Sequence, residues 1–167
     1  MLNNNVTEKK TKDNIVELHI KDPGFSVTEA FNTLRTNIMF SGENIKTVMV
    51  TSTNPAEGKS FVAMQLAKSF ADINKKVVYI DCDLRKSVTL SRYKIRGKRV
   101  GLTEYITGQK SQLIYETNIP NLAVILSGHV VPNPIELMES KKFDDLLSVL
   151  RERFDYVIID SPPVGSV

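Results

Sequence analysis

The chain has 167 residues, a formal net charge of +3 and one cysteine. Its length suits one domain, which can bury roughly 70% of the surface that the unfolded chain exposes. The lone Cys82 excludes an internal disulfide framework, and the mild charge gives no reason to expect a nucleic-acid partner. One basic run is best interpreted as a solvated loop, with phospholipid, an acidic protein or RNA as alternative contacts. It contains Arg92, Lys94, Arg96, Lys98 and Arg99.

The order of patterns along the chain predicts an arm followed by alternating helices and strands. Residues 1–24 are mainly polar and end at Pro23-Gly24, so we expect an arm over 1–24 and one folded domain over 25–167. Helices are expected at 27–40, 59–73, 102–106 and between 143 and 154. Strands are expected at 47–51, 77–80, 122–126 and 156–159. This alternation favours an α/β fold in which helices flank a mostly parallel sheet, a doubly wound arrangement of three layers.

A phosphate-binding loop is predicted between the strand at 47–51 and the helix that starts at Lys59. The loop ends in Gly58-Lys59-Ser60. Main-chain N–H groups there can point at phosphate oxygens, Lys59 supplies a positive charge, and the Ser60 hydroxyl can ligate Mg²⁺. The full motif has a glycine where this chain has Thr53, so the strand and helix around the loop strengthen the prediction. The expected nucleotide-binding residues are Pro55, Ala56, Glu57, Gly58, Lys59, Ser60 and Phe61.

Three aspartates lie at the ends of two later strands. Asp81 and Asp83 follow the strand at 77–80, and Asp160 follows the strand at 156–159. In open parallel sheets, ligands bind outside the carboxyl ends of the strands. Bare carboxylates would repel a nucleoside triphosphate, whereas a bridging Mg²⁺ reverses the sign of that interaction. The aspartates are therefore candidate metal ligands or a base for an attacking hydroxyl, with turn formation or helix capping as the alternative.

These motifs resemble those of the bacterial tyrosine kinases, the P-loop (Walker) kinases of capsule and exopolysaccharide synthesis. The resemblance runs from Phe25 to the C-terminus. It rests on Pro-x-Glu-Gly-Lys-Ser at 55–60, Asp-x-Asp-x-Arg at 81–85 and Asp-Ser-Pro-Pro at 160–163. The segments GLTEYITG at 101–108 and SGHVVPNPIEL at 127–137 are also similar to linking segments of that family. The resemblance implies a P-loop NTPase-like fold.

The resemblance also implies an activity: a Mg-ATP-dependent protein-tyrosine kinase that phosphorylates itself and regulates polysaccharide synthesis. ATP and Mg²⁺ would be its cofactors. Lys59 would contact the phosphates, and Asp81 would be the base for a tyrosine hydroxyl. The implied catalytic residues are Lys59, Asp81, Asp83 and Asp160, and the implied metal ligands are Ser60, Asp83 and Asp160.

Two kinds of partner are implied by the same resemblance. A membrane-spanning adaptor of polysaccharide synthesis would activate the kinase and hold it in the cytoplasm at the inner face of the membrane. This chain itself has no apolar run near the roughly 20 residues that span a bilayer. The family also forms rings through Glu-x-x-Arg-x-x-Arg on its first helix, which reads Glu29, Asn32, Arg35 here. Self-association through Glu29 and Arg35 is therefore expected, although Glu29 could instead form a capping box with Ser26.

The chain departs from the family pattern at two points. Ala56 replaces a glycine, and a positive φ there would cost on the order of 1 kcal/mol. Family members also continue past the Asp-Ser-Pro-Pro motif into a tyrosine-rich tail, so this chain, which stops at Val167, is expected to be a truncated member. Two alternatives stay open. One is a partitioning or division-site ATPase, which would need a lysine where this chain has Asn54, and the other is an inactive regulatory fragment.

Overall fold

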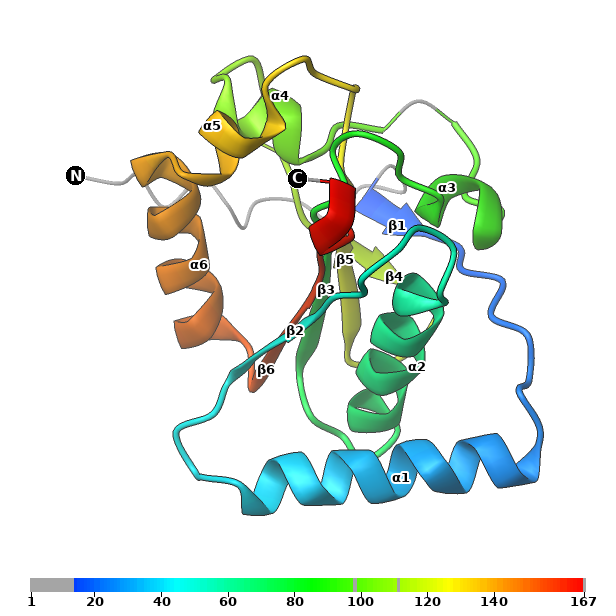
Figure 1. Cartoon of the computed structure of the whole chain (residues 1–167). Coiled ribbons are helices and arrows are strands. Elements are labelled where there is room, and N and C mark those ends of the chain that lie inside the picture. Colours follow the sequence, from blue (N-terminus) through cyan, green and yellow to red (C-terminus); the bar gives the residue numbers. More distant parts are fainter. Residues whose placement is uncertain (1–13, 98, 111, 167) are drawn as a thin grey trace.

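The computed structural model describes residues 14–97, 99–110 and 112–166. Their strands form one six-stranded sheet in the order β1-β4-β5-β3-β6-β2 (Figure 1). The β4–β5 pair is antiparallel and the other neighbouring pairs are parallel, which confirms the predicted sheet. The strands are β1 (Ile15–Val16), β2 (Thr47–Val50), β3 (Val77–Asp81), β4 (Tyr115–Thr117), β5 (Leu122–Ile125) and β6 (Tyr156–Asp160).

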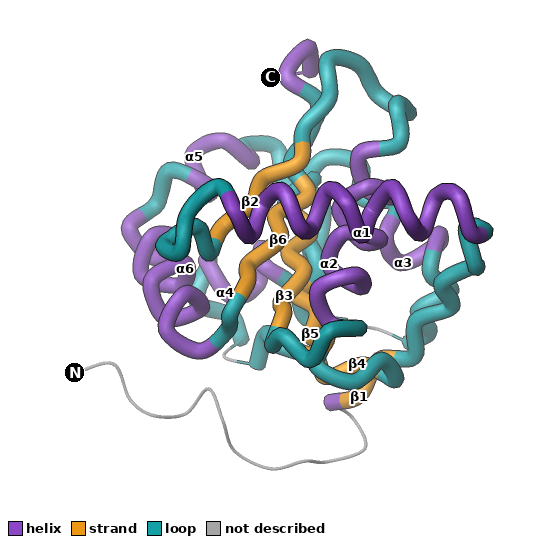
Figure 2. The backbone as a smooth tube through the Cα atoms, turned by 90° about the horizontal axis from the view of Figure 1, so that it is seen from below, coloured by secondary structure: helices purple, strands orange, loops and turns teal. Residues whose placement is uncertain are grey.

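Helices cover both faces of this sheet, as predicted. Alternate residues of β3 point to opposite faces. Val77 and Tyr79 pack in the same apolar cluster as the helix α2, whereas Val78 and Ile80 pack with α4 and α6. Figure 2 shows α2 and α6 on opposite sides of the strands. The helices are α1 (Phe25–Phe40), α2 (Lys59–Ala71), α3 (Thr89–Arg92), α4 (Leu102–Ile106), α5 (Pro134–Met138), α6 (Lys141–Arg153) and the 3₁₀ helix η3 (Val164–Ser166).

The central strands hold the sheet together. Every residue of β3 and β5 is buried, because parallel strands covered by helices on both faces have no solvent side. Between these layers α2 is buried along most of its length, as its largely apolar composition predicts. The carboxyl ends of β2, β3 and β6 consequently meet at one rigid edge, next to the start of α2.

The helix α1 packs against α2 (Figure 1). Its buried Phe31 meets the Phe61 ring edge-on, with 6.0 Å between the centroids. The predicted capping box is wrong, because α1 starts at Phe25 and no side chain caps it. Glu29 instead accepts a hydrogen bond from Asn32 one turn later.

The folded part of the chain begins before the predicted boundary at residue 24. β1 pairs in parallel with β4, and Val16 and Leu18 are 1% and 3% exposed. The Asn118 side chain extends this pairing, since it accepts from the Leu18 N–H and donates to the Leu18 carbonyl. The expectation of an arm over 1–24 is therefore wrong for this segment. Residues 1–13 lie outside the described part of the chain.

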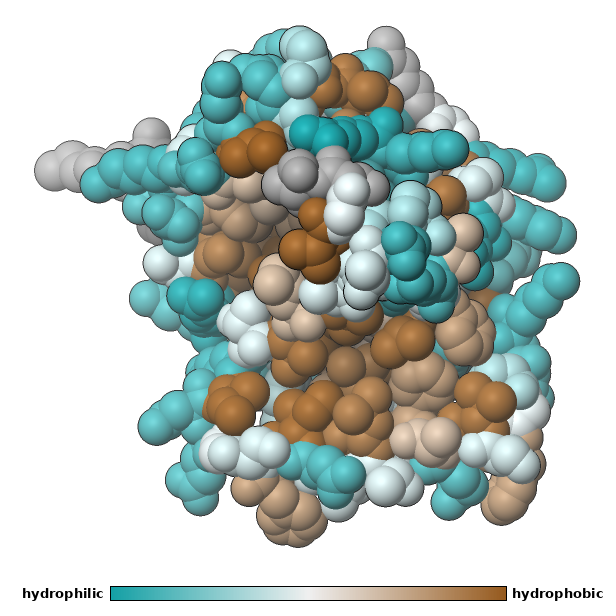
Figure 3. Space-filling view, viewed as in Figure 1, coloured by the Kyte–Doolittle hydropathy of each residue, from teal (hydrophilic) through white to brown (hydrophobic). Residues whose placement is uncertain are grey.

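The strand β2 forms one edge of the sheet. It pairs only with β6 among the described strands, and Met49 is 63% exposed. Met39, Phe40 and Ile45 nearby in the chain are also exposed. Figure 3 shows apolar side chains gathered on the face of the molecule where β2 runs. The loop that follows β2 leads directly into α2.

Candidate nucleotide site

The predicted strand-end aspartates lie side by side beneath the loop that joins β2 to α2. Asp81 is the register partner of Asp160 in the β3–β6 pair, and Val50 is the partner of Asp160 in the β2–β6 pair. Each carboxylate residue is only 1% exposed. The sheet topology therefore brings all three sequence motifs to one edge of the sheet.

The loop has two residues with positive φ. Ala56 has φ 64° and Gly58 has φ 92°. The positive φ considered for Ala56 in the sequence is thus confirmed, and this conformation is unfavourable for a residue with a β-carbon. The Glu57 carboxylate closes the loop by accepting from the Thr53 and Asn54 main-chain N–H groups at 3.0 and 3.1 Å. Hydrogen bonds from Asn54 in particular lower the pKa of Glu57.

A cavity of about 240 Å³ lies beside this loop. Its cationic side chains outnumber its single carboxylate, which suits a polyphosphate ligand. The loop contributes Pro55, Ala56, Gly58, Lys59 and Ser60. The segment after β3 contributes Asp83, Arg85, Lys86, Val88 and Arg92, and the third motif contributes Pro162 and Pro163.

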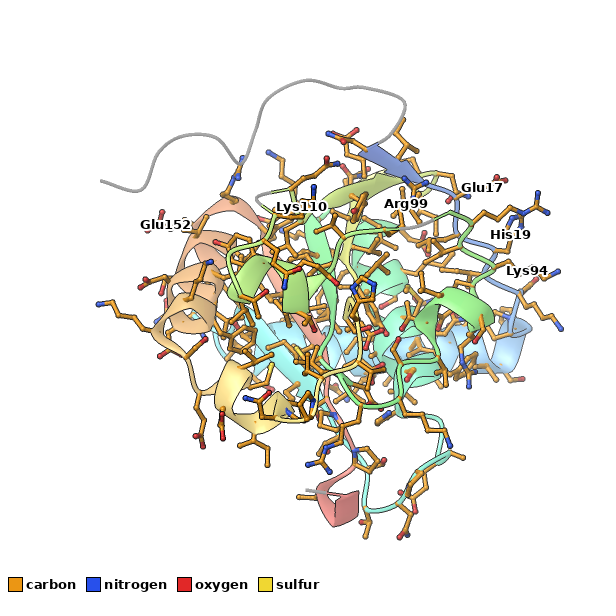
Figure 4. The ribbon with its side chains drawn as sticks, turned by 90° about the horizontal axis from the view of Figure 1, so that it is seen from above. Glu17, His19, Lys94, Arg99, Lys110 and Glu152 are labelled. Atoms are coloured by element: carbon orange, nitrogen blue, oxygen red, sulfur yellow. The ribbon has the colours of Figure 1, made fainter. Side chains whose placement is uncertain are left out.

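The sequence motifs predict no cavity role for Lys86, Val88 or the two prolines. The basic run that includes Arg92 favours a solvated loop, but Arg92 lines the cavity. Figure 4 shows Lys94 and Arg99 from the same run on the side of β1, near Glu17 and His19. The absence of any acid between Asp83 and Glu104 was the signal that could have linked this segment to an anionic ligand.

Two predicted nucleotide contacts serve the loop or the core with their side chains. Glu57 holds the loop through the hydrogen bonds given above. The Phe61 side chain packs on α1 through Phe31, so only the main chain of Phe61 is left to contact a nucleotide. Neither side chain lines the cavity.

Lys59 and Asp83 form an ion pair on the cavity wall. Their Nζ and Oδ2 atoms are 3.3 Å apart, and the two side chains are 11% and 10% exposed. The other oxygen of Asp83, Oδ1, accepts from the Lys86 main-chain N–H at 3.0 Å. Both oxygens of Asp83 are thus engaged, and its role as a metal ligand stays a prediction.

One carboxylate oxygen of Asp160 makes no hydrogen bond of regular geometry with the described residues. Its Oδ2 accepts from the Tyr79 hydroxyl at 2.9 Å, whereas its buried Oδ1 has no partner with hydrogen-bond geometry among the described residues. Burial raises the pKa of Asp160, and Ser60, Tyr79 and Lys59 oppose that rise. A buried carboxylate oxygen close to a serine hydroxyl under a cationic cavity fits a divalent cation.

The described residues contain no group of three or more His, Cys, Asp and Glu side chains that could hold a metal ion. A Mg²⁺ site does not need such a cluster, because Mg²⁺ usually takes one or two protein carboxylates and completes its coordination shell with water and substrate phosphates. Ser60 and Asp160 fit this requirement, so the predicted metal site remains a reasonable candidate.

Asp81 is the candidate base. Burial raises its pKa to about 6, and the Asp160 charge contributes to the rise. Its Oδ1 accepts from the Asp83 N–H at 3.1 Å, and its Oδ2 accepts from the Ser87 hydroxyl. Like Asp160, it lies beneath the cavity wall and does not line it.

Comparison with known proteins decides the family. The sequence model of an AAA domain family matches residues 45–167. The tyrosine-protein kinase CpsD of Streptococcus pneumoniae serotype 4 is 48% identical over 141 residues, which are 83% of this chain and 62% of that protein. CapB of Staphylococcus aureus is 36% identical over 163 residues, which are 95% of this chain and 71% of CapB. The chain belongs to the bacterial tyrosine kinase family.

Solved structures agree with this membership. The chimerical protein CapA2B2 superposes with a TM-score of 0.82 at 30% identity, over 91% of this chain and 71% of that one. The kinase domain of the Escherichia coli tyrosine kinase ETK gives 0.81 at 33% identity, over 87% and 58%. MinD from Pyrococcus horikoshii, at 20% identity and a TM-score of 0.60, shares the fold. The resemblance inferred from the three motifs is confirmed.

This member of the bacterial tyrosine kinase family spans 62% of the length of pneumococcal CpsD. In the described part of the chain, the structure has no helix of the length and apolarity needed to cross a membrane.

Proposed function

We propose that this chain is the nucleotide-binding part of a Mg-ATP-dependent protein-tyrosine kinase that acts in capsular or exopolysaccharide synthesis. The observation that carries the proposal is the arrangement at the strand ends. A phosphate loop with two residues of positive φ, and with Lys59 and Ser60 at its end, lies at a cation-rich cavity close to the paired carboxylates Asp81 and Asp160.

Some residues of the site would neutralise phosphate charge, and Asp81 would accept a proton. Lys59, Arg85 and Arg92 would neutralise the phosphates, and Lys59 can exchange Asp83 for a phosphate oxygen because the two are joined only by an ion pair. Ser60 and Asp160 would hold Mg²⁺, which would supply positive charge to offset the negative charge of the phosphates. With a pKa of about 6, Asp81 is deprotonated at pH 7 and can accept a proton from a tyrosine hydroxyl.

The same proposal includes two partners, a membrane adaptor and further copies of this chain. A membrane-spanning adaptor of polysaccharide synthesis would hold the kinase at the inner face of the membrane. Self-association would use α1, where Glu29 is exposed. Arg35 donates to the Ser69 carbonyl at 2.7 Å, so it also fixes α1 to α2. In sedimentation velocity, Glu29→Lys should therefore reduce any oligomer, whereas Glu43→Lys, an exposed site just past α1, should not.

The experiment that tests the activity measures phosphotyrosine on a supplied acceptor protein. The chain is incubated with Mg-ATP, a cytoplasmic adaptor segment and an acceptor from a full-length relative. We expect phosphotyrosine with the wild type and with Lys141→Met, which removes an exposed lysine on α6, but none with Lys59→Met. Sustained phosphate release without phosphotyrosine would instead indicate an ATPase, and neither product would indicate an inactive fragment.

A further inference from the structure

Two buried hydroxyls lie next to the buried Asp160 of the site. The Tyr79 hydroxyl donates to Asp160 Oδ2 at 2.9 Å and lies 3.2 Å from Thr89 Oγ1. The Thr89 main-chain N–H in turn donates to the Ser87 hydroxyl, which donates to Asp81. Tyr79 and Thr89 are both 0% exposed. The side chains of Asp160, Tyr79 and Thr89 therefore form one buried hydrogen-bonded chain.

The position of Tyr79 makes its hydroxyl costly unless it is paired. Tyr79 lies in the middle of β3, between Val78 and Ile80, and its ring belongs to the apolar cluster beneath α2. A buried hydroxyl without a partner destabilises a folded protein. The ring alone would fill the same space, so the hydroxyl matters through the groups that it contacts, which are Asp160 and Thr89.

The Tyr79 contact leaves the two oxygens of Asp160 in different states. Oδ2 is held by the phenol, whereas Oδ1 is buried and has no partner with hydrogen-bond geometry among the described residues. Fixing one oxygen of a carboxylate sets the direction of the other. Without this contact, Oδ2 of Asp160 would lose its Tyr79 donor beside the like-charged Asp81.

We propose that Tyr79, supported by Thr89, is a positioning residue that orients Asp160 so that Oδ1 is available to the hydrated Mg²⁺ of a bound nucleotide. The inference rests on the proposed function. Tyr79 does not line the cavity, so it acts through Asp160 and not on the nucleotide itself. Its removal should weaken the metal-dependent part of binding and spare the rest.

The test compares ADP binding in Mg²⁺ with ADP binding in EDTA, by calorimetry on the full chain. In Tyr79→Phe we expect the affinity in EDTA to be unchanged and the enhancement by Mg²⁺ to fall about 10-fold or more. Thr89→Val should lower the same enhancement by a smaller factor, and it tests the hydrogen-bonded chain if Tyr79→Phe does not fold.

Tyr115→Phe is the matched control. Tyr115 is 3% exposed, and its hydroxyl is hydrogen-bonded to the main chain of Val100. This variant loses a buried hydroxyl far from the loop, so it should keep the wild-type enhancement. If Tyr79→Phe keeps the wild-type enhancement by Mg²⁺, this inference is wrong but the proposed function stands. The same holds for Thr89→Val where Tyr79→Phe does not fold. ADP binding by the wild type that does not depend on Mg²⁺ would also overturn this inference and leave the proposed function standing. A folded wild type that binds no ADP in either condition would overturn the proposed function and this inference with it.

Discussion

Asp81 illustrates a conflict between chemistry and stability at the residue scale. Its pKa of about 6 lies above the ordinary 3.8 because the carboxylate is buried. A carboxylate with a raised folded-state pKa stabilises the protein at low pH and loses that contribution as pH rises from 3.8 through 6. At neutral pH the buried charge therefore opposes folding.

Asp81→Asn should consequently be more stable than the wild type in the absence of nucleotide. The gain in unfolding free energy should be on the order of 3 kcal/mol above pH 7 and roughly half of that at pH 5. Urea denaturation at pH 5, 6, 7 and 8 measures it, with the exposed Glu152→Gln as the control that should show no such gain. Equal stability of Asp81→Asn and the wild type at pH 7.5 would contradict the burial of a charged Asp81.

Ala56 gives a second prediction for a single residue. Its φ of 64° disfavours a side chain with a β-carbon, so Ala56→Gly should stabilise the chain by up to about 1 kcal/mol. Thermal unfolding is the measurement. Ala30→Gly in the right-handed helix α1 is the matched control, and it should destabilise by about 0.5–1 kcal/mol. A loss of stability in both variants would mean that Ala56 is not strained.

At the scale of elements, the β2 edge is the exposed feature with the clearest consequence. An unpaired strand edge with an exposed apolar side chain is a template for association between chains. Met49→Lys should therefore lower the association of this polypeptide at high concentration, as measured by light scattering. Leu90→Lys, which adds the same charge on the exposed side of α3, should leave association unchanged. Equal effects of the two variants would assign the change to net charge.

At the scale of the whole molecule, the packing of the tyrosines constrains the acceptor. Of the five tyrosines, Tyr79, Tyr93 and Tyr115 are buried, and the other two are half-buried. A protein kinase needs an acceptor hydroxyl that can leave its own fold. Tyr79, Tyr93 and Tyr115 are therefore not expected to be acceptors of the proposed kinase.

Mass spectrometry of the folded chain after incubation with Mg-ATP should accordingly find no phosphotyrosine at Tyr79, Tyr93 or Tyr115. The same chain unfolded and digested before incubation with an active tyrosine kinase is the control for peptide detection. Phosphotyrosine at Tyr79 in the folded chain would contradict the packing of β3.

The sequence allowed prediction of the sheet and the loop because their signals are local. The apolar strands that end in Asp81 and Asp160 and the Gly58-Lys59-Ser60 turn each occupy a few adjacent residues. β1 and β4 were missed because they are short and are stabilised by pairing with distant segments. The Tyr79 contact to Asp160 joins residues 81 positions apart, so no local pattern could reveal it.

The measurement that tests the account most directly is Mg-ADP binding to this chain by calorimetry, with circular dichroism to show that each protein is folded. We predict binding to the wild type and to the control Lys141→Met, and a loss of binding in Lys59→Met. A folded wild type that binds no Mg-ADP, or equal binding by Lys59→Met, would contradict a phosphate site built on the loop after β2.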